Sequence, residues 1–332
     1  MPETTRTTET TPQPGSAAPG PAPLIRAEGL RKRYEAARGE GFTAVAGIDF
    51  AVRPGEAFGI LGANGAGKSS TMRMIACTSP ATGGSLEVLG LDARTEGARI
   101  RARIGVVPQD DTVDVELTVR ENLLIYGRYF GLPKAEIRRR AAELLDFARL
   151  TDKADERVEA LSGGMRRRLT IARALINEPE IVLLDEPTTG LDPQARHLLW
   201  ERLFRLKDDG ITLILTTHYM DEAEQLCDRL VVMDGGLIVA EGSPAGLIER
   251  YCTREVLELR FGPGEREAMT DRARGLVERI EELPDRLLLY TDEAEATLAG
   301  AHARGVVPLT ALTRRAGLED VFLTLTGRSL VD

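Results

Sequence analysis

Short apolar runs alternate with longer amphipathic stretches along the middle of the chain. The runs at 57–61, 104–107, 181–184, 211–216 and 230–233 are rich in Ile, Leu and Val, and the stretches between them have helical spacing. Turn residues such as Pro54 and Gly55 separate the two kinds of segment. Strands that alternate with helices predict an α/β domain with a largely parallel sheet.

Changes in this pattern divide the chain into parts. Residues 1–23 are rich in Thr, Pro, Ala and Gly and have too little apolar surface to offset the entropy of ordering, so we expect a disordered leader. An α/β domain is predicted over 24–249, with an inserted helical subdomain at about 112–165, where strand patterns stop. The tail, 250–332, predicts a small α+β domain with strands at 256–261 and 286–291, a helix over 265–282, and then a helix, a strand and a helix.

Charge and composition narrow the class of protein. The net charge is −9, whereas nucleic-acid-binding domains usually carry a basic excess, so no nucleic-acid partner is expected. Three separated cysteines and three histidines supply neither a disulfide framework nor a cysteine metal site, which fits a reducing cytosol. The apolar runs are far shorter than the ~20 residues of a membrane helix, and the leader lacks the apolar stretch of a signal peptide.

The segment 62–70 has the phosphate-loop (P-loop) pattern GxxxxGK[ST]. It follows a predicted strand and precedes a predicted helix, so a glycine-rich turn with an incidental lysine is the weaker interpretation. The glycines let backbone N–H groups face the phosphates, Lys68 adds positive charge, Ser69 offers a hydroxyl to Mg²⁺, and the helix N-terminus favours anions. The predicted nucleotide-binding residues of this loop are Gly62, Asn64, Gly65, Ala66, Gly67, Lys68, Ser69 and Ser70.

Two acidic residues end the predicted strand at 181–184. Because α/β sheets bind ligands at the carboxyl ends of their strands, we expect both side chains to face the phosphate loop. Asp185 is predicted to hold the Mg²⁺ shell through water, and Glu186 to act as the general base on the attacking water. A solvated acidic turn is the alternative, and it is weaker because the phosphate loop lies upstream.

A third motif, Leu161-Ser162-Gly163-Gly164-Met165, precedes an amphipathic helix. Ser162 stands where an N-cap belongs, and the two glycines expose the first backbone N–H groups of the helix. Taken alone, this pentapeptide predicts only a capped helix start.

Together with the other motifs, it makes the chain resemble the ABC ATPase family, whose signature is Leu-Ser-Gly-Gly, over residues 24–249. The resemblance implies a largely parallel sheet with an antiparallel subdomain and the inserted helical subdomain. It assigns Gln109 to Mg²⁺ and the attacking water, His218 to the γ-phosphate, and Asp192 to a dimer-contact loop. Tyr34 lies where the family stacks an aromatic ring on adenine, although packing is an equal alternative for this side chain.

The resemblance also implies how the subunits assemble. In this family each nucleotide lies between the phosphate loop of one subunit and the signature of another. One copy of each motif therefore implies an ATP-sandwich homodimer, or pairing with a second cassette, in which Ser162, Gly163 and Gly164 complete the partner's site. ATP and Mg²⁺ are the implied substrate and cofactor, and hydrolysis of ATP to ADP and phosphate is the implied reaction.

Longer stretches are similar to exporter ATPases of the nodulation-factor and daunorubicin-resistance kind, including 108–111, 118–123, 126–131 and 317–323. Such relatives drive lipo-oligosaccharides or drugs outward through a separate six-helix permease, which would hold this chain at the cytoplasmic face of the cell membrane. An importer ATPase is one alternative. A non-transport ABC ATPase is the other, but DNA-maintenance relatives carry long coiled coils between the motifs and translation-associated relatives carry two cassettes.

Two arginine clusters, at 138–140 and 166–168, admit a lipid or nucleic-acid patch. Their spacing favours the solvated faces of helices instead. His197, His302 and Trp200 are expected to be structural. The tail is expected either to regulate the ATPase or to stabilise its dimer, and the sequence leaves both open.

Overall fold

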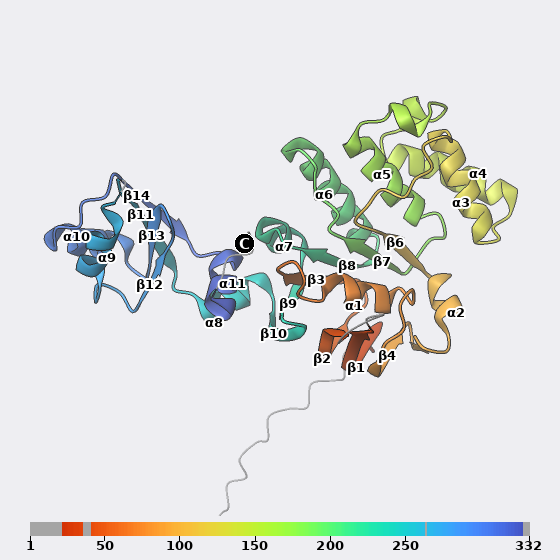
Figure 1. The fold of residues 1–332 in the computed structure, drawn as a ribbon. Helices are drawn as coiled ribbons and strands as arrows, with labels where there is room; N and C mark the ends of the chain where they lie inside the picture. Colours follow the sequence, from red (N-terminus) through yellow and green to blue (C-terminus); the bar gives the residue numbers. More distant parts are fainter. Residues whose placement is uncertain (1–21, 36–40, 263, 328–332) are drawn as a thin grey trace, which may run out of the picture.

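The computed structural model describes residues 22–35, 41–262 and 264–327, so most of the predicted leader lies outside the described residues. Figure 1 shows a central part built on two sheets, a helical part on one side of it, and a C-terminal part with its own sheet on the other side. The mixed α/β fold class is confirmed, with both a largely parallel sheet and an antiparallel one in the central part.

The first sheet is antiparallel, with the strand order β2-β1-β4-β5. Buried and exposed residues alternate along its first strand, where Ile25, Ala27 and Leu30 point into the core. Such alternation is typical of a sheet with one covered face. The strands are β1 (Ile25–Tyr34), β2 (Phe42–Val52), β4 (Gly83–Val88) and β5 (Leu91–Asp92).

The second sheet has the order β10-β9-β3-β8-β7-β6, and all its pairings are parallel except β10 with β9. The five strands predicted from apolar runs are confirmed, each to within one residue at either end. They read as continuous apolar runs because both faces of the sheet are covered. The strands are β3 (Ala57–Gly62), β6 (Ile104–Val107), β7 (Ile181–Asp185), β8 (Thr212–Thr217), β9 (Arg229–Asp234) and β10 (Leu237–Gly242).

Helices cover this sheet on both sides. One face packs against the antiparallel sheet and the first helix, through residues such as Phe58 and Met74. The other face packs against helices that follow later in the chain, through residues such as Leu184 and Leu203. The helices of the central part are α1 (Lys68–Ile75), α2 (Gly97–Arg101), α6 (Pro193–Asp208), α7 (Met220–Leu226) and α8 (Pro244–Tyr251).

The helical part has a core of its own, built around Leu123, Leu145 and Leu169. Thr118 and Glu121 form a capping box at its first helix. Its elements are α3 (Val119–Tyr129), α4 (Lys134–Phe147), η1 (Thr151–Lys153), η2 (Val158–Ala160) and α5 (Gly163–Ala174).

The C-terminal part is an antiparallel sheet with the order β12-β13-β11-β14 and two helices. The prediction of one helix over 265–282 is wrong in its second half. The helix ends at Ala273, because Gly275 has φ +74° and the chain then turns back as a strand. The elements are β11 (Glu255–Arg260), α9 (Arg266–Ala273), β12 (Arg279–Glu282), β13 (Arg286–Thr291), α10 (Ala294–Ala303) and β14 (Thr310–Arg315).

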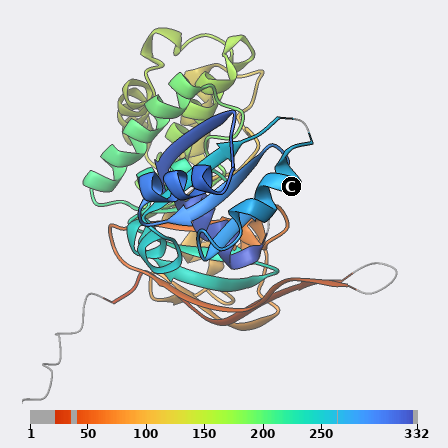
Figure 2. The same cartoon turned by 90° about the vertical axis from the view of Figure 1, so that its left-hand side faces the viewer.

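The last helix, α11 (Leu318–Thr326), returns to the central part. Leu318, Val321 and Phe322 are buried in the same core as residues of α6, α7 and α8. Glu224 in α7 accepts the backbone N–H of Leu318 at 2.7 Å, which caps the helix. Figure 1 shows α11 beside α8, and Figure 2 views the molecule from the side of the C-terminal part. The tail is therefore connected to the central part twice: its first residues follow α8, and its last helix, α11, packs beside α8 in the same core.

Candidate functional site

The phosphate loop joins the end of β3 to the start of α1. Asn64 and Gly65 are exposed, whereas Ala66 and Gly67 are buried. Gly67 has φ +106°, and a Cβ on it would lie 2.4 Å from the Ala44 carbonyl oxygen, so only glycine fits there. No side chain caps α1 at Gly67, which leaves the first N–H groups of the helix for an anionic ligand.

Lys68 places its ammonium group inside this loop. The side chain is 5% exposed, and Nζ donates to the carbonyl oxygens of Gly62 at 2.7 Å and Ala63 at 3.2 Å. Glu186 Oε1 lies 3.7 Å from Nζ. Burial lowers the pKa of Lys68, and the neighbouring carboxylates of Glu186 and Asp185 oppose that effect. The loop thus holds a positive charge at the helix N-terminus.

Asp185 and Ser69 meet at the end of β7. Ser69 Oγ donates to Asp185 Oδ1 at 3.3 Å, and the Thr216 hydroxyl donates to the same oxygen. A carboxylate and a hydroxyl at this distance are hard oxygen donors, the type that Mg²⁺ prefers. The donor set therefore fits the predicted cation. Among the described residues no group of three or more His, Cys, Asp or Glu side chains forms a metal cluster, so such an ion would need water or phosphate ligands as well.

Glu186 stands at the centre of the candidate site. It is 7% exposed and has a left-handed backbone, with φ +46°. Gln109 Nε2 donates to Oε2 at 3.1 Å, and the Thr189 hydroxyl donates to the same oxygen at 3.3 Å. His218 Nδ1 lies 3.2 Å from Oε1, the oxygen that also faces Lys68. Residues from three distant segments of the sequence therefore meet at the Glu186 carboxylate.

Tyr34 lies beside the phosphate loop. Its hydroxyl is 3.3 Å from Ser70 Oγ, and its ring stacks on that of Phe42, with centroids 5.4 Å apart. Phe42 is 61% exposed and pairs with Tyr34 across β1 and β2, and the sequence analysis missed it. An aromatic residue at the start of the strand that follows Tyr34 was the available signal. Lys32 Nζ also lies 4.8 Å from the centroid of the Tyr34 ring, so Phe42 is the exposed member of this stacked pair.

Ser162 and Asp192 lie at the starts of two other helices. Ser162 is the N-cap of α5, as predicted, and its hydroxyl accepts the N–H of Met165 at 3.3 Å. Asp192 caps α6 by accepting the N–H of Ala195 at 2.8 Å. Ser162 and Gly163 are exposed, Gly164 is half-buried, and α5 starts in the helical part while α1 lies in the central part (Figure 1). The predicted role of these residues requires a second subunit, so it stays a prediction.

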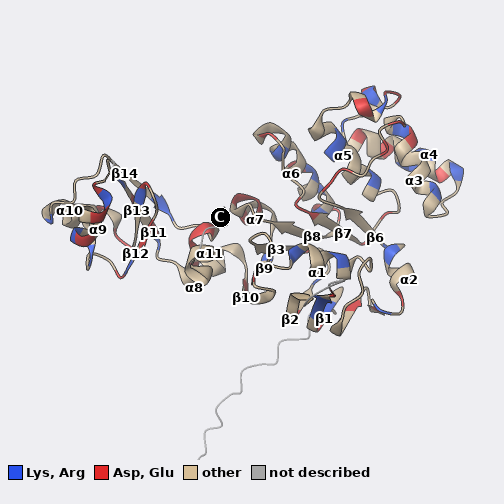
Figure 3. Ribbon diagram, in the orientation of Figure 1, with Lys and Arg blue, Asp and Glu red and all other residues tan. Residues whose placement is uncertain are grey.

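The arginine clusters differ from each other. On α4, Arg139 forms ion pairs with Glu136 and Glu143, so acidic and basic residues are mixed on that surface (Figure 3). This agrees with a solvated helix face. On α5 the prediction of a solvated face is wrong for Arg167, which is 4% exposed. The spacing of the arginines along α5 does not reveal this burial, because loops of the central part, distant in sequence, cover the Arg167 side chain.

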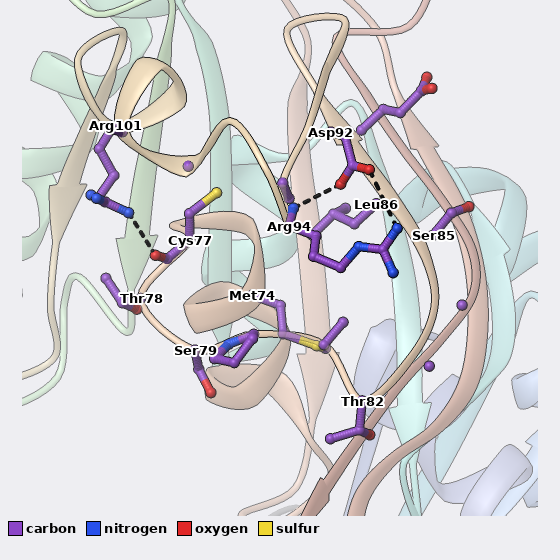
Figure 4. Close-up of a pocket in the computed structure, with 18 residues that line it drawn as sticks. Met74, Cys77, Thr78, Ser79, Thr82, Ser85, Leu86, Asp92, Arg94 and Arg101 are labelled. Carbon is purple, nitrogen blue, oxygen red and sulfur yellow. Dashed lines mark hydrogen bonds and ion pairs between the residues drawn. The ribbon is translucent and has the colours of Figure 1, made fainter.

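A hollow of about 480 Å³ lies away from the phosphate loop, between the end of α1, strand β4 and helix α2. In Figure 4, Arg101 donates to the Cys77 carbonyl oxygen and Asp92 accepts the Arg94 N–H, at 2.8 and 2.7 Å. Arg101 and Asp92 in this hollow are therefore paired with protein atoms. None of the helices in the described residues is long and apolar enough to cross a membrane.

Comparisons with known proteins agree with this site. A family model described as "ABC transporter" matches residues 45–189, and one described as "Nodulation factor export protein NodI, C-terminal domain" matches residues 266–327. The Nod factor export ATP-binding protein I of Ralstonia nicotianae is 49% identical over 324 residues, covering 96% of this chain and 99% of that protein. Its counterpart in Rhizobium sp. is 50% identical, covering 86% and 93%.

Two solved structures of ABC proteins resemble this chain in fold. The dimeric ATP-binding cassette MJ0796 bound to ADP and Pi has a TM-score of 0.62 at 29% identity, covering 66% of this chain and 98% of that chain. The structure of cbiO1 from Clostridium perfringens, part of the ABC transporter complex cbiONQ, has a TM-score of 0.63 at 27% identity, covering 75% and 94%.

The fold and the site define an ATP-binding cassette. The chain belongs to the ATP-binding subunits of ABC transporters, within the family of the Nod factor export ATP-binding proteins. The resemblance drawn from the motifs is thereby confirmed, both for the ABC ATPase fold and for the nodulation-factor export kind.

Proposed function

We propose that this chain hydrolyses ATP to ADP and phosphate, with Glu186 as the general base. The observation that carries the proposal is the meeting of Lys68, Gln109 and His218 around the Glu186 carboxylate, next to an uncapped helix N-terminus. Lys68 and the N–H groups of the loop would bind the β- and γ-phosphates. Glu186 would take the proton of the attacking water, with Gln109 positioning that water and His218 contacting the γ-phosphate.

Mg²⁺ would be held by Ser69 directly and by Asp185 and Gln109, and it would offset negative charge on the phosphate oxygens. Phe42 and Tyr34 would supply the surface on which the adenine base stacks, because the Tyr34 hydroxyl lies beside Ser70 and the exposed Phe42 ring stacks on Tyr34. In this arrangement the adenine would lie at the rim of the site and the phosphates at the N-terminus of α1.

The complete site is proposed to form between two copies of the chain. Ser162, Gly163 and Gly164 lie at an exposed helix start, where backbone N–H groups favour a phosphate. The related cassette MJ0796 was solved as a dimer with ADP and Pi, which supports the same arrangement here. Asp192 and its loop would then lie in the contact between the copies.

Mixing two inactive variants tests the composite site. Lys68→Ala removes a charged contact to the phosphates, and Ser162→Arg adds bulk and charge at the start of α5. Each alone should lack ATPase activity, while Ser162→Arg should still bind ATP, because its own phosphate loop is unchanged. A mixed dimer contains one site with an intact loop and an intact signature, so mixing should restore part of the activity. Normal hydrolysis by Ser162→Arg alone would contradict the proposal.

We further propose that the chain energises export of a lipo-oligosaccharide, drug or similar amphiphile through a separate six-helix membrane permease, at the cytoplasmic face of the membrane. The names of the relatives and the match of the tail to the NodI C-terminal domain support export. A groove of about 500 Å³ along β6, α2 and α3 offers a surface on which the permease would dock. Tyr129 and Val106, both exposed, line it, and it continues past Val106 toward Gln109.

Co-purification with the membrane protein encoded beside this chain tests this proposal. Tyr129→Arg places a charge in the groove without changing a buried residue, so it should abolish co-purification and leave the ATPase activity of the isolated chain intact. Leu237→Arg is the matched control, because Leu237 is an exposed apolar residue on β10, outside the groove. Full retention of the permease by Tyr129→Arg would contradict the assignment of the groove.

A further inference from the structure

Arg167 is a buried arginine in the second turn of the signature helix α5. Its guanidinium group has five N–H donors. Five backbone carbonyl oxygens accept from it: Nε donates to Pro187 at 2.8 Å, Nη1 to Pro108 at 2.6 Å and Gln109 at 3.2 Å, and Nη2 to Asp185 and Glu186, both at 3.1 Å. The donors and the acceptors therefore match in number.

These carbonyls belong to two segments that carry the proposed catalytic groups. The glutamine segment, residues 108–112, contains Gln109, and the catalytic loop, residues 185–189, contains Asp185 and Glu186. The two segments also meet through the Gln109 and Glu186 side chains. One side chain on α5 thus holds the backbone on both sides of the contact between the proposed base and the glutamine.

Further residues of α5 hold the glutamine segment. The Thr170 hydroxyl donates to Asp111 at 3.3 Å, and Arg173 donates to the Thr112 carbonyl oxygen at 2.6 Å. Together with Arg167 they recur at every third position, so they lie on one face of the helix. Leu169 and Ile171 of the same helix belong to the core of the helical part and the core of the central part, respectively. Helix α5 therefore links the core of the helical part to the core of the central part, from which the catalytic loop extends.

We propose that Arg167 is a positioning residue that ties the signature helix to Glu186 and Gln109, so that docking of Ser162 on a second subunit is transmitted to the proposed base. This rests on the proposed hydrolysis of ATP between two copies. Besides the five backbone bonds, Arg167 Nη1 forms an ion pair with the Asp111 carboxylate of the glutamine segment at 3.8 Å, so Arg167 acts on Glu186 and Gln109 through the segments that carry them.

No other side chain can make these five bonds. Lysine has three donors on one nitrogen, and glutamine has two. The planar fork of an arginine is also rigid, so it fixes the two segments relative to each other. A substitution should let the Glu186 carboxylate sample other positions, and a misplacement of about 1 Å can cost up to roughly a hundredfold in rate.

The test compares Arg167→Gln and Arg167→Lys with Arg168→Gln as the matched control. Arg168 is the next residue on α5 and donates to the Ala148 carbonyl oxygen within the helical part. We expect kcat for ATP hydrolysis to fall roughly tenfold to a hundredfold in Arg167→Gln, with KM for ATP within about twofold of wild type. The kcat of Arg167→Lys should lie between those of wild type and Arg167→Gln. This variant serves as the test if Arg167→Gln does not fold.

A double-mutant cycle with Gln109→Ala separates positioning from general loss of structure. Arg167→Gln should cost several-fold less in kcat when Gln109 is already absent, because part of what Arg167 positions is gone. The inference would be overturned if Arg167→Gln lowered kcat equally in the wild-type and Gln109→Ala backgrounds, or if its kcat were no lower than that of Arg168→Gln. Neither result would contradict the proposal that the chain hydrolyses ATP. A wild-type chain without ATPase activity would overturn both proposals.

Discussion

The buried carboxyl group of Glu222 should make this protein less stable as the pH rises. Glu222 lies in α7, four residues after His218, and is completely buried. Neither of its oxygens forms a well-aligned hydrogen bond within the described residues, although the side chains of Thr217, Thr188 and Trp200 lie close to its carboxyl group. Burial raises the pKa of Glu222 to about 7, against opposing polar contacts from Thr217, Thr188 and Trp200.

The sign follows from comparing the folded and unfolded chains. In the unfolded chain Glu222 ionises near its ordinary pKa of 4.5, whereas in the folded chain it stays protonated until about pH 7. Between pH 4.5 and about pH 7 the folded chain keeps this proton, whereas the unfolded chain has released it. The free energy of unfolding therefore falls as the pH rises. At about 1.4 kcal/mol per pH unit, the loss between pH 5 and pH 8 is roughly 2–3 kcal/mol.

Urea unfolding of wild type and Glu222→Gln at pH 5, 6, 7 and 8 measures this effect. The only tryptophan, Trp200, lies beside Glu222, and its fluorescence reports unfolding of the core to which Trp200 belongs. The amide cannot ionise, so Glu222→Gln should gain roughly 2–3 kcal/mol relative to wild type between pH 5 and pH 8. Glu249→Gln, at an exposed position on α8, should follow the wild-type curve. Parallel curves for wild type and Glu222→Gln would refute the reasoning.

Three further predictions concern the proposed base, the last helix and the adenine surface. Glu186→Gln should bind ATP without cleaving it, because an amide cannot take a proton, and should elute as a dimer in gel filtration with Mg-ATP. Phe322→Ala should cost about 3–5 kcal/mol in urea unfolding, whereas Leu312→Ala, at an exposed position, should change stability by less than about 0.5 kcal/mol. Phe42→Ala should weaken ATP binding roughly two- to tenfold in calorimetry, since a stacked aromatic pair contributes about 0.5–1.5 kcal/mol.

Burial on both faces explains which strands the sequence predicts well. Strands such as β3 and β8 are apolar at nearly every position, so their runs stand out from the helices. Strand β1 alternates buried and exposed residues and changes register with its neighbours near Leu30, which leaves a weaker pattern. The tail helix was predicted too long because the charged residues after Ala273 suit either a helix or an edge strand, and pairing with β13 decides.

The site residues are predictable where they belong to a contiguous motif. The phosphate loop carries its chemistry in nine successive positions, 62–70, so spacing alone identifies it. Phe42 lies beyond the segment 36–40, and only the pairing of β1 with β2 brings it onto Tyr34. Arg167 is flanked by two other arginines, and nothing in that sequence tells which of the three is buried. Its partners come from two distant segments, so its role depends on tertiary structure.

The position of Glu186 depends on contacts that lie outside the phosphate loop. Its backbone N–H donates to Thr216 on β8, its carbonyl oxygen accepts from Arg167 on α5, and its side chain accepts from Gln109. The sheet fixes the first contact, because β7 and β8 pair directly. The other two depend on α5 and the glutamine segment, which border the groove proposed for the permease and the signature proposed for the partner subunit. A base held in this way would respond to both partners, so docking of either one would change the rate at which ATP is cleaved.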